Sequence, residues 1–232
     1  MKKKILMMAT GGTIASRPTE HGLAPAVHAE ELLEGLTDLR ETYQIDTLEV
    51  CSIDSTNMTW KHWLKLAECL EHHYQNYDGF VICHGTDTMA YTAAALSYLA
   101  QKLGKPVVLT GSQRPFGQQI TDAGRKLRDA VCVAADPRCR GVQIVFNGQI
   151  IAGTRAKKVK RFSFDAFTSI NFPLLGLVQN ERVIRYLEEP EREGGPVFYH
   201  NLNPKVFLLK LTPGMQPQIL EPVFREFDCV IV

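Results

Sequence analysis

The sequence carries almost no excess of either charge. Its 26 Lys and Arg residues against 25 Asp and Glu leave a formal net charge of +1. A domain that binds nucleic acid through phosphate contacts carries a clear basic excess, so nucleic acid is not a favoured partner. No stretch approaches the roughly 20 apolar residues of a membrane helix either. We therefore expect a soluble protein with no membrane-spanning segment.

Motifs for nucleotides, metals and disulfides are also missing. Neither GxGxxG nor GxxxxGK[ST] occurs, which argues against nucleotide binding. The six cysteines form no CxxC pair and none lies near a His at metal-ligand spacing. We expect reduced core thiols in a cytosolic protein, with no metal and no organic cofactor. The cysteines are Cys51, Cys69, Cys83, Cys132, Cys139 and Cys229.

The length is awkward for a domain count. At roughly 150 residues per domain, 232 residues make about one and a half domains. A composition of 45% hydrophobic and 22% charged residues is that of an ordinary globular chain, which excludes disorder over most of its length. The apolar run Ile5 to Ala9 behind Lys2–Lys4 is too short for the core of a secretory signal and predicts a buried first strand.

Short β-rich runs alternate with helical patterns along most of the chain. This alternation predicts an α/β fold, a doubly wound and mostly parallel sheet with helices on both faces. The Asn147-Gly148 pair predicts a tight hairpin that adds an antiparallel strand. The predicted strands are Ile5 to Ala9, Leu48 to Ile53, Gly79 to Cys83, Pro106 to Thr110 and Val142 to Phe146. One predicted helix begins after Thr59, and two more cover Met89 to Leu103 and Asp122 to Ala135.

The pattern changes towards the C-terminus. We expect an N-terminal domain over 1–187, a charged, Pro- and Gly-rich linker over 188–204, and the start of a second, smaller α/β domain over 205–232. A core strand at the end of a chain is unusual for a complete domain. We therefore expect a truncated chain, whose last residues, 229–232, pair with something outside this sequence.

Small hydroxyl residues and glycines follow four of the predicted strands. Ligands of open parallel sheets bind beyond the carboxyl ends of the strands, so these clusters are expected to converge. One such cluster is more often a turn or a helix cap than a site, but four on one sheet edge favour a site. The clusters are Thr10-Gly11-Gly12-Thr13, Asp54-Ser55-Thr56-Asn57, His84-Gly85-Thr86-Asp87-Thr88 and Gly111-Ser112-Gln113.

The clusters offer hydroxyl chemistry. Thr13 and Thr86 are candidate nucleophiles, Asp87 is a carboxylate, and lysines follow at 157, 158 and 160. A threonine hydroxyl becomes a competent nucleophile when a base takes its proton, and a partly desolvated lysine beside a carboxylate can be that base. We expect His84 to orient its loop rather than to react, and the pair His72-His73 to cap a helix end.

Two of these segments carry a resemblance to a known family. Residues 9–16 (ATGGTIAS) and 84–89 (HGTDTM) resemble the two signature motifs of the bacterial-type L-asparaginases. Residues 54–58, 110–113 and 153–158 are similar to further family segments in the same order, so the resemblance covers essentially the whole chain. The sequence DSTNM at 54–58 is most similar to the type I, cytoplasmic branch.

The resemblance implies a role for each matching residue. Thr13 matches the nucleophile that attacks the side-chain amide of asparagine and forms an acyl-enzyme. Thr86 matches a second catalytic threonine, which Lys158 and Asp87 tune. The positions that match substrate-binding residues are Ser55, Thr56, Asp87 and Ser112, the last through its backbone carbonyl.

The chemistry agrees with these roles. Asp87 can accept from the substrate ammonium, while Ser55 and loop N–H groups can donate to its carboxylate. We expect backbone N–H groups near Gly12 and Thr13 to meet the oxyanion.

The sequence departs from the family pattern in two places. Leu23 stands where many members carry a loop tyrosine that closes over the substrate. Relatives also continue past the point that matches Val232 and complete the C-terminal domain there. The resemblance further implies a homodimer or homotetramer in which subunit contacts finish the site.

Three functional hypotheses remain at this point. The first is an amidohydrolase that converts L-asparagine to aspartate and ammonia, with weaker action on glutamine. The second is an amino-acid-binding fragment without turnover, because the C-terminal domain is incomplete. The third is the amidase subunit of a tRNA-dependent amidotransferase, which uses the same fold but usually carries an extra N-terminal domain.

Overall fold

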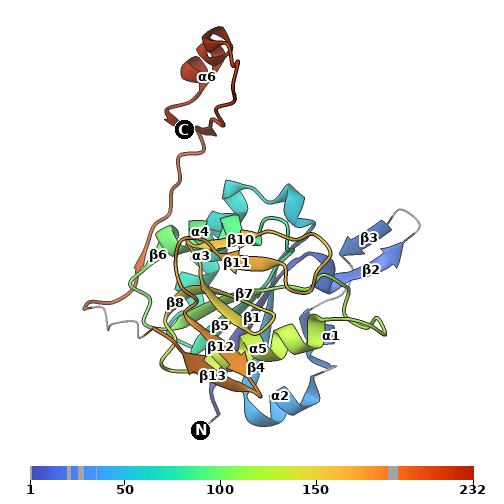
Figure 1. Ribbon diagram of the computed structural model, residues 1–232. Helices are drawn as coiled ribbons and strands as arrows, with labels where there is room; N and C mark the ends of the chain where they lie inside the picture. The colour runs from blue at the N-terminus through green and yellow to red at the C-terminus, as the bar shows by residue number, and fades with distance from the viewer. Residues whose placement is uncertain (1, 20–21, 26–28, 35, 188–192) are drawn as a thin grey trace. The chain divides into compact units, whose positions relative to one another are not determined.

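The computed structural model describes residues 2–19, 22–25, 29–34, 36–187 and 193–232 (Figure 1). The chain divides into two compact units, Met1–His200 and Asn201–Val232. Residues 188–192, part of the expected linker, lie outside the described residues. Within the described chain every helix is too short or too polar to pass through a bilayer.

An eight-stranded sheet organises the first unit, with strand order β13-β12-β9-β8-β7-β5-β1-β4. The five neighbouring strands β4, β1, β5, β7 and β8 are parallel, and β9, β12 and β13 add antiparallel pairs at one end. The doubly wound, mostly parallel fold is therefore confirmed. The strands are β1 (Lys4–Gly11), β4 (Gln44–Ile53), β5 (Gly79–Cys83), β7 (Pro106–Thr110), β8 (Gly141–Phe146), β9 (Gln149–Ala152), β12 (Gly176–Gln179) and β13 (Arg182–Arg185).

Small two-stranded ribbons and short turns surround this sheet. The ribbons pair β2 (Ser16–Thr19) with β3 (Gly22–Pro25), β6 (Ala100–Gln101) with β14 (Val197–Phe198), and β10 (Ala156–Lys158) with β11 (Phe167–Ser169). Two 3₁₀ turns, η1 (Thr13–Ala15) and η2 (Ser55–Asn57), directly follow β1 and β4. The helices are α1 (Ala29–Glu34), α2 (Thr37–Thr42), α3 (Trp60–His73), α4 (Met89–Leu99) and α5 (Ala123–Ala135).

Side-chain alternation along the strands builds a core on each face of the sheet. Ile5 and Met7 of β1 point to the face that α1 and α5 cover, where Leu32 and Leu127 pack against them. The intervening residues of β1 point to the opposite face, which α3 and α4 cover (Figure 1). Each buried aliphatic side chain stabilises the fold by about 1.5–3 kcal/mol, so both helix layers are held firmly to the sheet.

One crossover has an unusual hand. The connections β5–α4–β7 and β7–α5–β8 step across the sheet in the same direction, but α4 and α5 lie on opposite faces, so the two have opposite hands (Figure 1). The connection from β1 to β4 steps across the sheet in the opposite direction, and its helices α1 and α2 lie on the same face as α5. Because both the direction and the face are reversed, this connection has the same hand as β5–α4–β7. Since crossovers are right-handed in about 98% of cases, β7–α5–β8 is the left-handed one. In the loop between β7 and α5, the Phe116 N–H donates to the Ile14 carbonyl at 3.3 Å, so this loop passes the end of β5 and reaches the turn after β1.

The Asn147-Gly148 hairpin is confirmed. Asn147 and Gly148 both have positive φ, 51° and 75°, between the antiparallel strands β8 and β9. The prediction for the helix after Met89 is wrong at its end, because α4 stops at Leu99 rather than Leu103. Residues 100–101 instead pair with Val197–Phe198, and the Tyr199 N–H donates to the Leu99 carbonyl. Hydrogen bonds to a strand from far along the chain therefore replace the helical ones.

The cysteines depart from a uniform core assignment. Only Cys83 and Cys139 are buried, while Cys51, Cys69 and Cys132 are half-buried and Cys229 is exposed; all six belong to the described residues, and no disulfide joins any two of them. Sequence periodicity does not distinguish the centre of a core from its boundary, and a small thiol is tolerated at either place.

The second unit is a small βαβ arrangement. Parallel strands β15 (Val206–Leu208) and β16 (Cys229–Ile231) are joined through the 3₁₀ turn η3 (Pro217–Leu220) and helix α6 (Glu221–Glu226). The expectation that residues 229–232 pair outside this sequence is wrong for β16, because Val206 pairs with Cys229 and Leu208 with Ile231.

Candidate functional site

The predicted clusters all follow carboxyl ends of the adjacent strands β4, β1, β5 and β7. Gly12, after β1, touches Gly85, after β5: a Cβ on Gly12 would lie 2.4 Å from the Gly85 Cα. Gly85 touches Ser55, after β4, since its Cβ would lie 2.6 Å from the Ser55 Oγ. Gly111, after β7, touches the same motif, because its Cβ would lie 2.2 Å from the His84 carbonyl oxygen. All four clusters therefore meet at close backbone contact, at the position where the strand order changes direction.

Thr13 begins the η1 turn behind two positions that only glycine suits. Gly11 and Gly12 have φ values of 94° and 78°, in the left-handed region. The Gly12 carbonyl accepts from the Ser16 hydroxyl at 2.8 Å, which fixes the turn. The Gly12 N–H donates to the Ile53 carbonyl at 3.0 Å. The Gly12 N–H is therefore already bonded to β4, and the oxyanion role expected near Gly12 and Thr13 stays a prediction for the Thr13 N–H.

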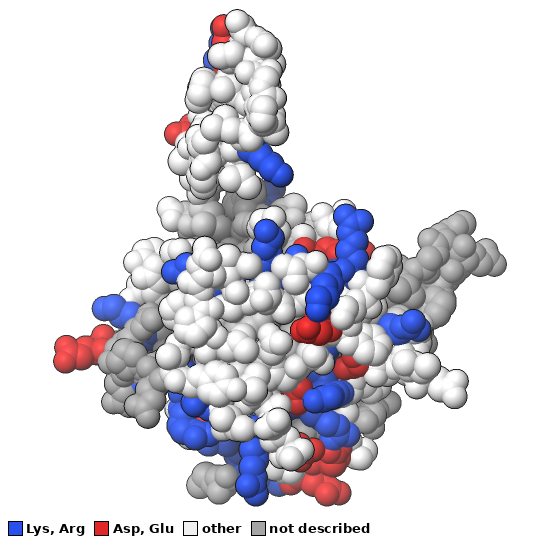
Figure 2. Space-filling view, viewed as in Figure 1, with Lys and Arg blue, Asp and Glu red and all other residues white. Residues whose placement is uncertain are grey.

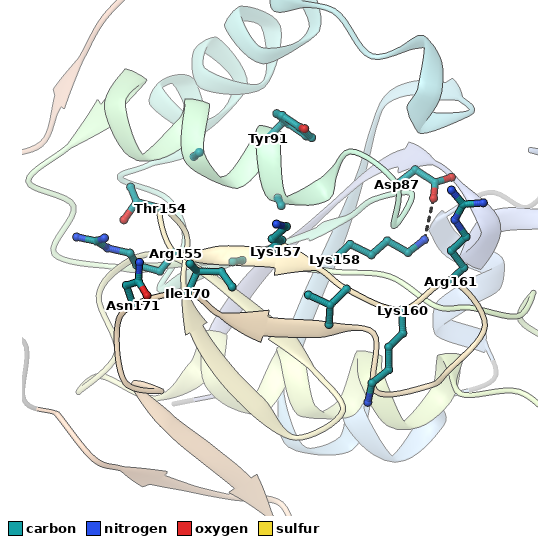
Figure 3. Close-up of a pocket in the computed structure, with 14 residues that line it drawn as sticks. Asp87, Tyr91, Thr154, Arg155, Lys157, Lys158, Lys160, Arg161, Ile170 and Asn171 are labelled. Atoms are coloured by element: carbon teal, nitrogen blue, oxygen red, sulfur yellow. Dashed lines mark hydrogen bonds and ion pairs between the residues drawn. The ribbon is translucent and has the colours of Figure 1, made fainter. Parts of the chain in front are cut away.

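Thr86, Asp87 and Lys158 form one hydrogen-bonded group. The Lys158 ammonium donates to Thr86 Oγ1 at 2.8 Å and to Asp87 Oδ1 at 2.7 Å. Figure 3 shows Lys158 extending from β10 towards Asp87. Thr86 is buried, whereas the Asp87 side chain is 58% exposed and open to a ligand. A cation at hydrogen-bond distance from a hydroxyl stabilises negative charge that develops on its oxygen.

Ser55 and Thr56 sit on the η2 turn after β4. The Asp54 carboxylate accepts from the Thr56 N–H and its hydroxyl, both at 2.8 Å, which caps the turn. The Ser55 carbonyl accepts from the Thr88 hydroxyl at 2.7 Å, so this turn is tied to the second motif. Ser55 is buried against Gly85, and Thr56 is exposed.

Ser112 lies in the loop between β7 and α5 and is fully buried. Its hydroxyl donates to the Arg114 carbonyl within that loop. The next residue, Gln113, belongs to the same cluster, but its sequence context indicates no functional role. Its Oε1 accepts from the Thr86 hydroxyl at 3.1 Å, and its Nε2 donates to the Arg161 carbonyl at 2.7 Å. Gln113 therefore bridges Thr86 to the segment that follows Lys158.

His84 is buried beneath the second motif and contacts no solvent. Its Nδ1 lies 2.7 Å from the Gly85 carbonyl and its Nε2 lies 2.8 Å from Thr92 Oγ1. Burial lowers the pKa of His84 to about 4, so the imidazole is neutral near pH 7. These contacts place His84 under Gly85, where an orienting residue is expected. His72 and His73 end α3, at its negative dipole end, as expected.

A pocket of about 640 Å³ adjoins this group on the side of α4. Asp87 and Lys158 line it together with Tyr91, Thr154 and Arg155 (Figure 3). Among the described residues, no three His, Cys, Asp or Glu side chains are grouped to hold a metal ion. On the face in Figure 2, Lys and Arg side chains are interspersed with Asp and Glu rather than forming one basic surface.

Leu23, the departure from the loop tyrosine, lies on β3 and pairs with Pro18 of β2. The tip between these strands, residues 20–21, lies outside the described residues. Every other predicted site residue lies at or beside the carboxyl edge of the sheet, on turns or on β10.

Comparisons with known proteins agree with this arrangement. The asparaginase N-terminal family model matches residues 4–192. The L-asparaginase of Thermococcus kodakarensis is 37% identical over 99% of this chain and 70% of its own length. Its solved structure superposes with a TM-score of 0.91, covering 98% of this chain and 69% of that one.

Two further relatives widen the comparison. The solved structure described as a probable cytoplasmic L-asparaginase of Campylobacter jejuni is 28% identical, with a TM-score of 0.85, over 99% of this chain and 73% of its own. A glutamyl-tRNA(Gln) amidotransferase component from Metallosphaera sedula is 34% identical over 94% of this chain and 53% of its own length. With a family model matched over most of its length, the chain belongs to the asparaginase family.

Proposed function

We propose that the chain hydrolyses L-asparagine to L-aspartate and ammonia through an acyl-enzyme on Thr13. One observation carries the proposal most strongly: Lys158 donates to both Thr86 Oγ1 and Asp87 Oδ1, beside the glycine contact that precedes Thr13 and Thr86. The similarity to the L-asparaginase of Thermococcus kodakarensis supports the same reaction.

In the proposed reaction, Asp87 accepts from the substrate ammonium, and Ser55 with Thr56 holds the α-carboxylate. Thr13 Oγ attacks the side-chain amide carbon, and a C–O bond forms as the C–N bond breaks. The proton of the Thr13 hydroxyl passes to the departing nitrogen, which leaves as ammonia while the Ser112 carbonyl holds the amide.

Water completes the proposed cycle. It attacks the ester carbon, its hydroxyl stays on the product as the carboxyl group of aspartate, and its proton returns to Thr13. Thr86 is the second catalytic hydroxyl, and the Lys158 ammonium stabilises negative charge that develops on its oxygen.

The test is ammonia release from L-asparagine by the full chain and by Thr13→Ala. We expect the variant to lose activity by about 10³-fold or more with an unchanged circular dichroism spectrum. Undiminished turnover by the folded variant contradicts the role of Thr13. Aspartate binding by calorimetry, with no ammonia released by the wild-type chain, would instead support the non-catalytic binding fragment.

The similarity to an amidotransferase component supports a second candidate function, the amidase of a tRNA-dependent amidotransferase. An amidase of that kind supplies ammonia to a partner, so activity that appears only with the partner and a charged tRNA would favour it. We expect free ammonia from asparagine alone.

We further propose a type I, cytoplasmic enzyme that assembles as a homodimer or homotetramer. The DSTNM segment at 54–58 and the description of the Campylobacter jejuni relative support the branch and the compartment. Exposed aromatic side chains support self-association: Phe162 is 94% exposed and Tyr91 is 65% exposed. Light scattering on the purified chain tests the assembly, and a monomer at micromolar concentration contradicts it.

We also propose that residues 1–187 form the catalytic domain and residues 205–232 the start of the C-terminal domain, joined by 188–204. Limited proteolysis tests this division. Cleavage is expected first between 188 and 204, and early cleavage within a core strand such as β7 would contradict it.

A further inference from the structure

A buried lysine lies beneath the loop that carries Ser112. Lys126 of α5 is only 2% exposed, and its ammonium forms an ion pair with Asp122, the N-cap residue of that helix. The ammonium also lies 3.2 Å from the centroid of the Phe146 ring, at the end of β8. A lysine is almost never buried unless it is paired, and here the partner carboxylate is buried as well.

Asp122 connects this lysine to the loop between β7 and α5. Its carboxylate accepts from the backbone N–H of Gln113 at 3.1 Å to both oxygens and from that of Arg114 at 3.1 Å. These two residues directly follow Ser112, and the Gln113 side chain accepts from the Thr86 hydroxyl. The Asp122 carboxylate therefore holds the backbone that directly follows the Ser112 carbonyl.

The Lys126 ammonium compensates the negative charge of the buried Asp122 carboxylate. A buried carboxylate that loses its cationic partner becomes an uncompensated charge, and it takes up a proton more readily. A protonated carboxyl loses acceptor capacity, which weakens its bonds to the two loop N–H groups.

We propose that Lys126 is a positioning residue: it keeps Asp122 ionised, and ionised Asp122 holds the 112–114 loop in place for amide binding. The inference rests on the proposed function for its effect on turnover. Lys126 contacts no reacting atom, and it acts only through Asp122 and the loop backbone.

The charges around Lys126 agree with this role. Asp122 and Asp129 face it from its own helix, and Asp165 faces it from the connection between β10 and β11, where the Phe164 ring also lies 5.9 Å away. Burial lowers the pKa of Lys126 to about 8, while these carboxylates oppose the lowering. The lysine is therefore charged at neutral pH, and its hold on Asp122 weakens above about pH 8.

The central test is Lys126→Met, which keeps the side-chain length and removes the charge. Its control is Lys105→Met, because Lys105 is half-buried and bonded to the Tyr74 and Tyr77 carbonyls, away from this loop. Two quantities are measured between about pH 5 and 8: kcat/KM for asparagine, and hydrogen exchange of the Gln113 and Arg114 amides.

We expect Lys126→Met to lower kcat/KM by about 10- to 100-fold at the acidic end, because small displacements of binding groups cost that much. The two amides exchange faster in this variant than in Lys105→Met, after correction for global stability. Exchange rates and a pH profile equal to those of Lys105→Met would overturn the proposal.

The double variant Lys126→Met/Asp122→Asn keeps the test decisive if the single variant does not fold. The amide oxygen that this change introduces at position 122 still accepts from the loop N–H groups and needs no counter-ion. We expect slow exchange and a kcat/KM without the new acidic dependence; a retained dependence, or fast exchange, overturns the proposal. If the wild-type chain releases no ammonia, the proposed function fails, and the exchange rates alone decide the role of Lys126.

Discussion

The buried His84 network offers a quantitative prediction about pH and stability. The Gly85 carbonyl can only accept, so His84 Nδ1 carries the proton and donates. Nε2 then accepts from the Thr92 hydroxyl, which in turn accepts from Trp63 Nε1 at 2.9 Å. A second proton on His84 would turn Nε2 from an acceptor into a donor, so the bond from the Thr92 hydroxyl would be lost. It would also place a positive charge in a site without solvent.

The size of the effect follows from the pKa of His84. Burial lowers it from an ordinary value of 6.5 to about 4. A lowering of this size corresponds to about 3 kcal/mol of unfolding free energy. Because the unfolded chain binds the proton first, this stability is complete above about pH 6.5 and is lost as the pH falls towards 4.

The perturbation is His84→Gln, which keeps an acceptor for Thr92 and does not titrate. Urea unfolding of both proteins is measured near pH 7.5 and near pH 4.5. The wild type is expected to be more stable at the higher pH, and its advantage is expected to shrink by about 2–3 kcal/mol at the lower pH. Other titrating groups are common to both chains and cancel. An advantage that does not change with pH would refute the neutral, buried His84.

Three further predictions concern single side chains. Gly12→Ala is expected to lower stability by about 2 kcal/mol or more and to remove activity, because Gly12 has φ 78° and its new Cβ would lie 2.4 Å from the Gly85 Cα; Gly104→Ala, with open space around it, is the control for urea unfolding. Asp129→Asn is expected to stabilise the fold by about 2 kcal/mol near pH 7.5. Burial raises the pKa of Asp129 to about 6 and its Oδ2 has no partner among the described residues, so the gain fades as the pH falls towards 4, which unfolding at two pH values checks. Lys158→Met is expected to lower kcat for asparagine by about 10²-fold or more, because Thr86 and Asp87 lose their shared donor; an unchanged kcat measured by ammonia release would contradict this.

Much of the fold follows from local patterns. Buried parallel strands read as continuous apolar runs, and Asn147-Gly148 favours positive φ at two successive residues, so the sheet and its hairpin could be predicted. The end of α4 could not, because its apolar pattern continues to Leu103 while the backbone of residues 100–101 pairs with Val197–Phe198. A contact across that much sequence leaves no local signal.

The candidate site divides in the same way. The convergence of four clusters follows from parallel topology, which places Thr13, Ser55 and Thr86 at one edge. The role of Lys126 could not be predicted, because this lysine lies among Arg125, Arg128 and Asp129, a run that is typical of a solvated helix face. Its burial is decided by Asp122 and the Phe146 ring, which only the folded chain brings together.

The most direct test of the account is to find the covalent intermediate. The full chain is mixed with L-asparagine, quenched in acid within its first turnovers and digested, and the peptides are examined by mass spectrometry. The account predicts an aspartyl ester on Thr13, absent from Thr13→Ala. Ammonia release with an ester on Thr86, or with no ester on either threonine, would contradict it.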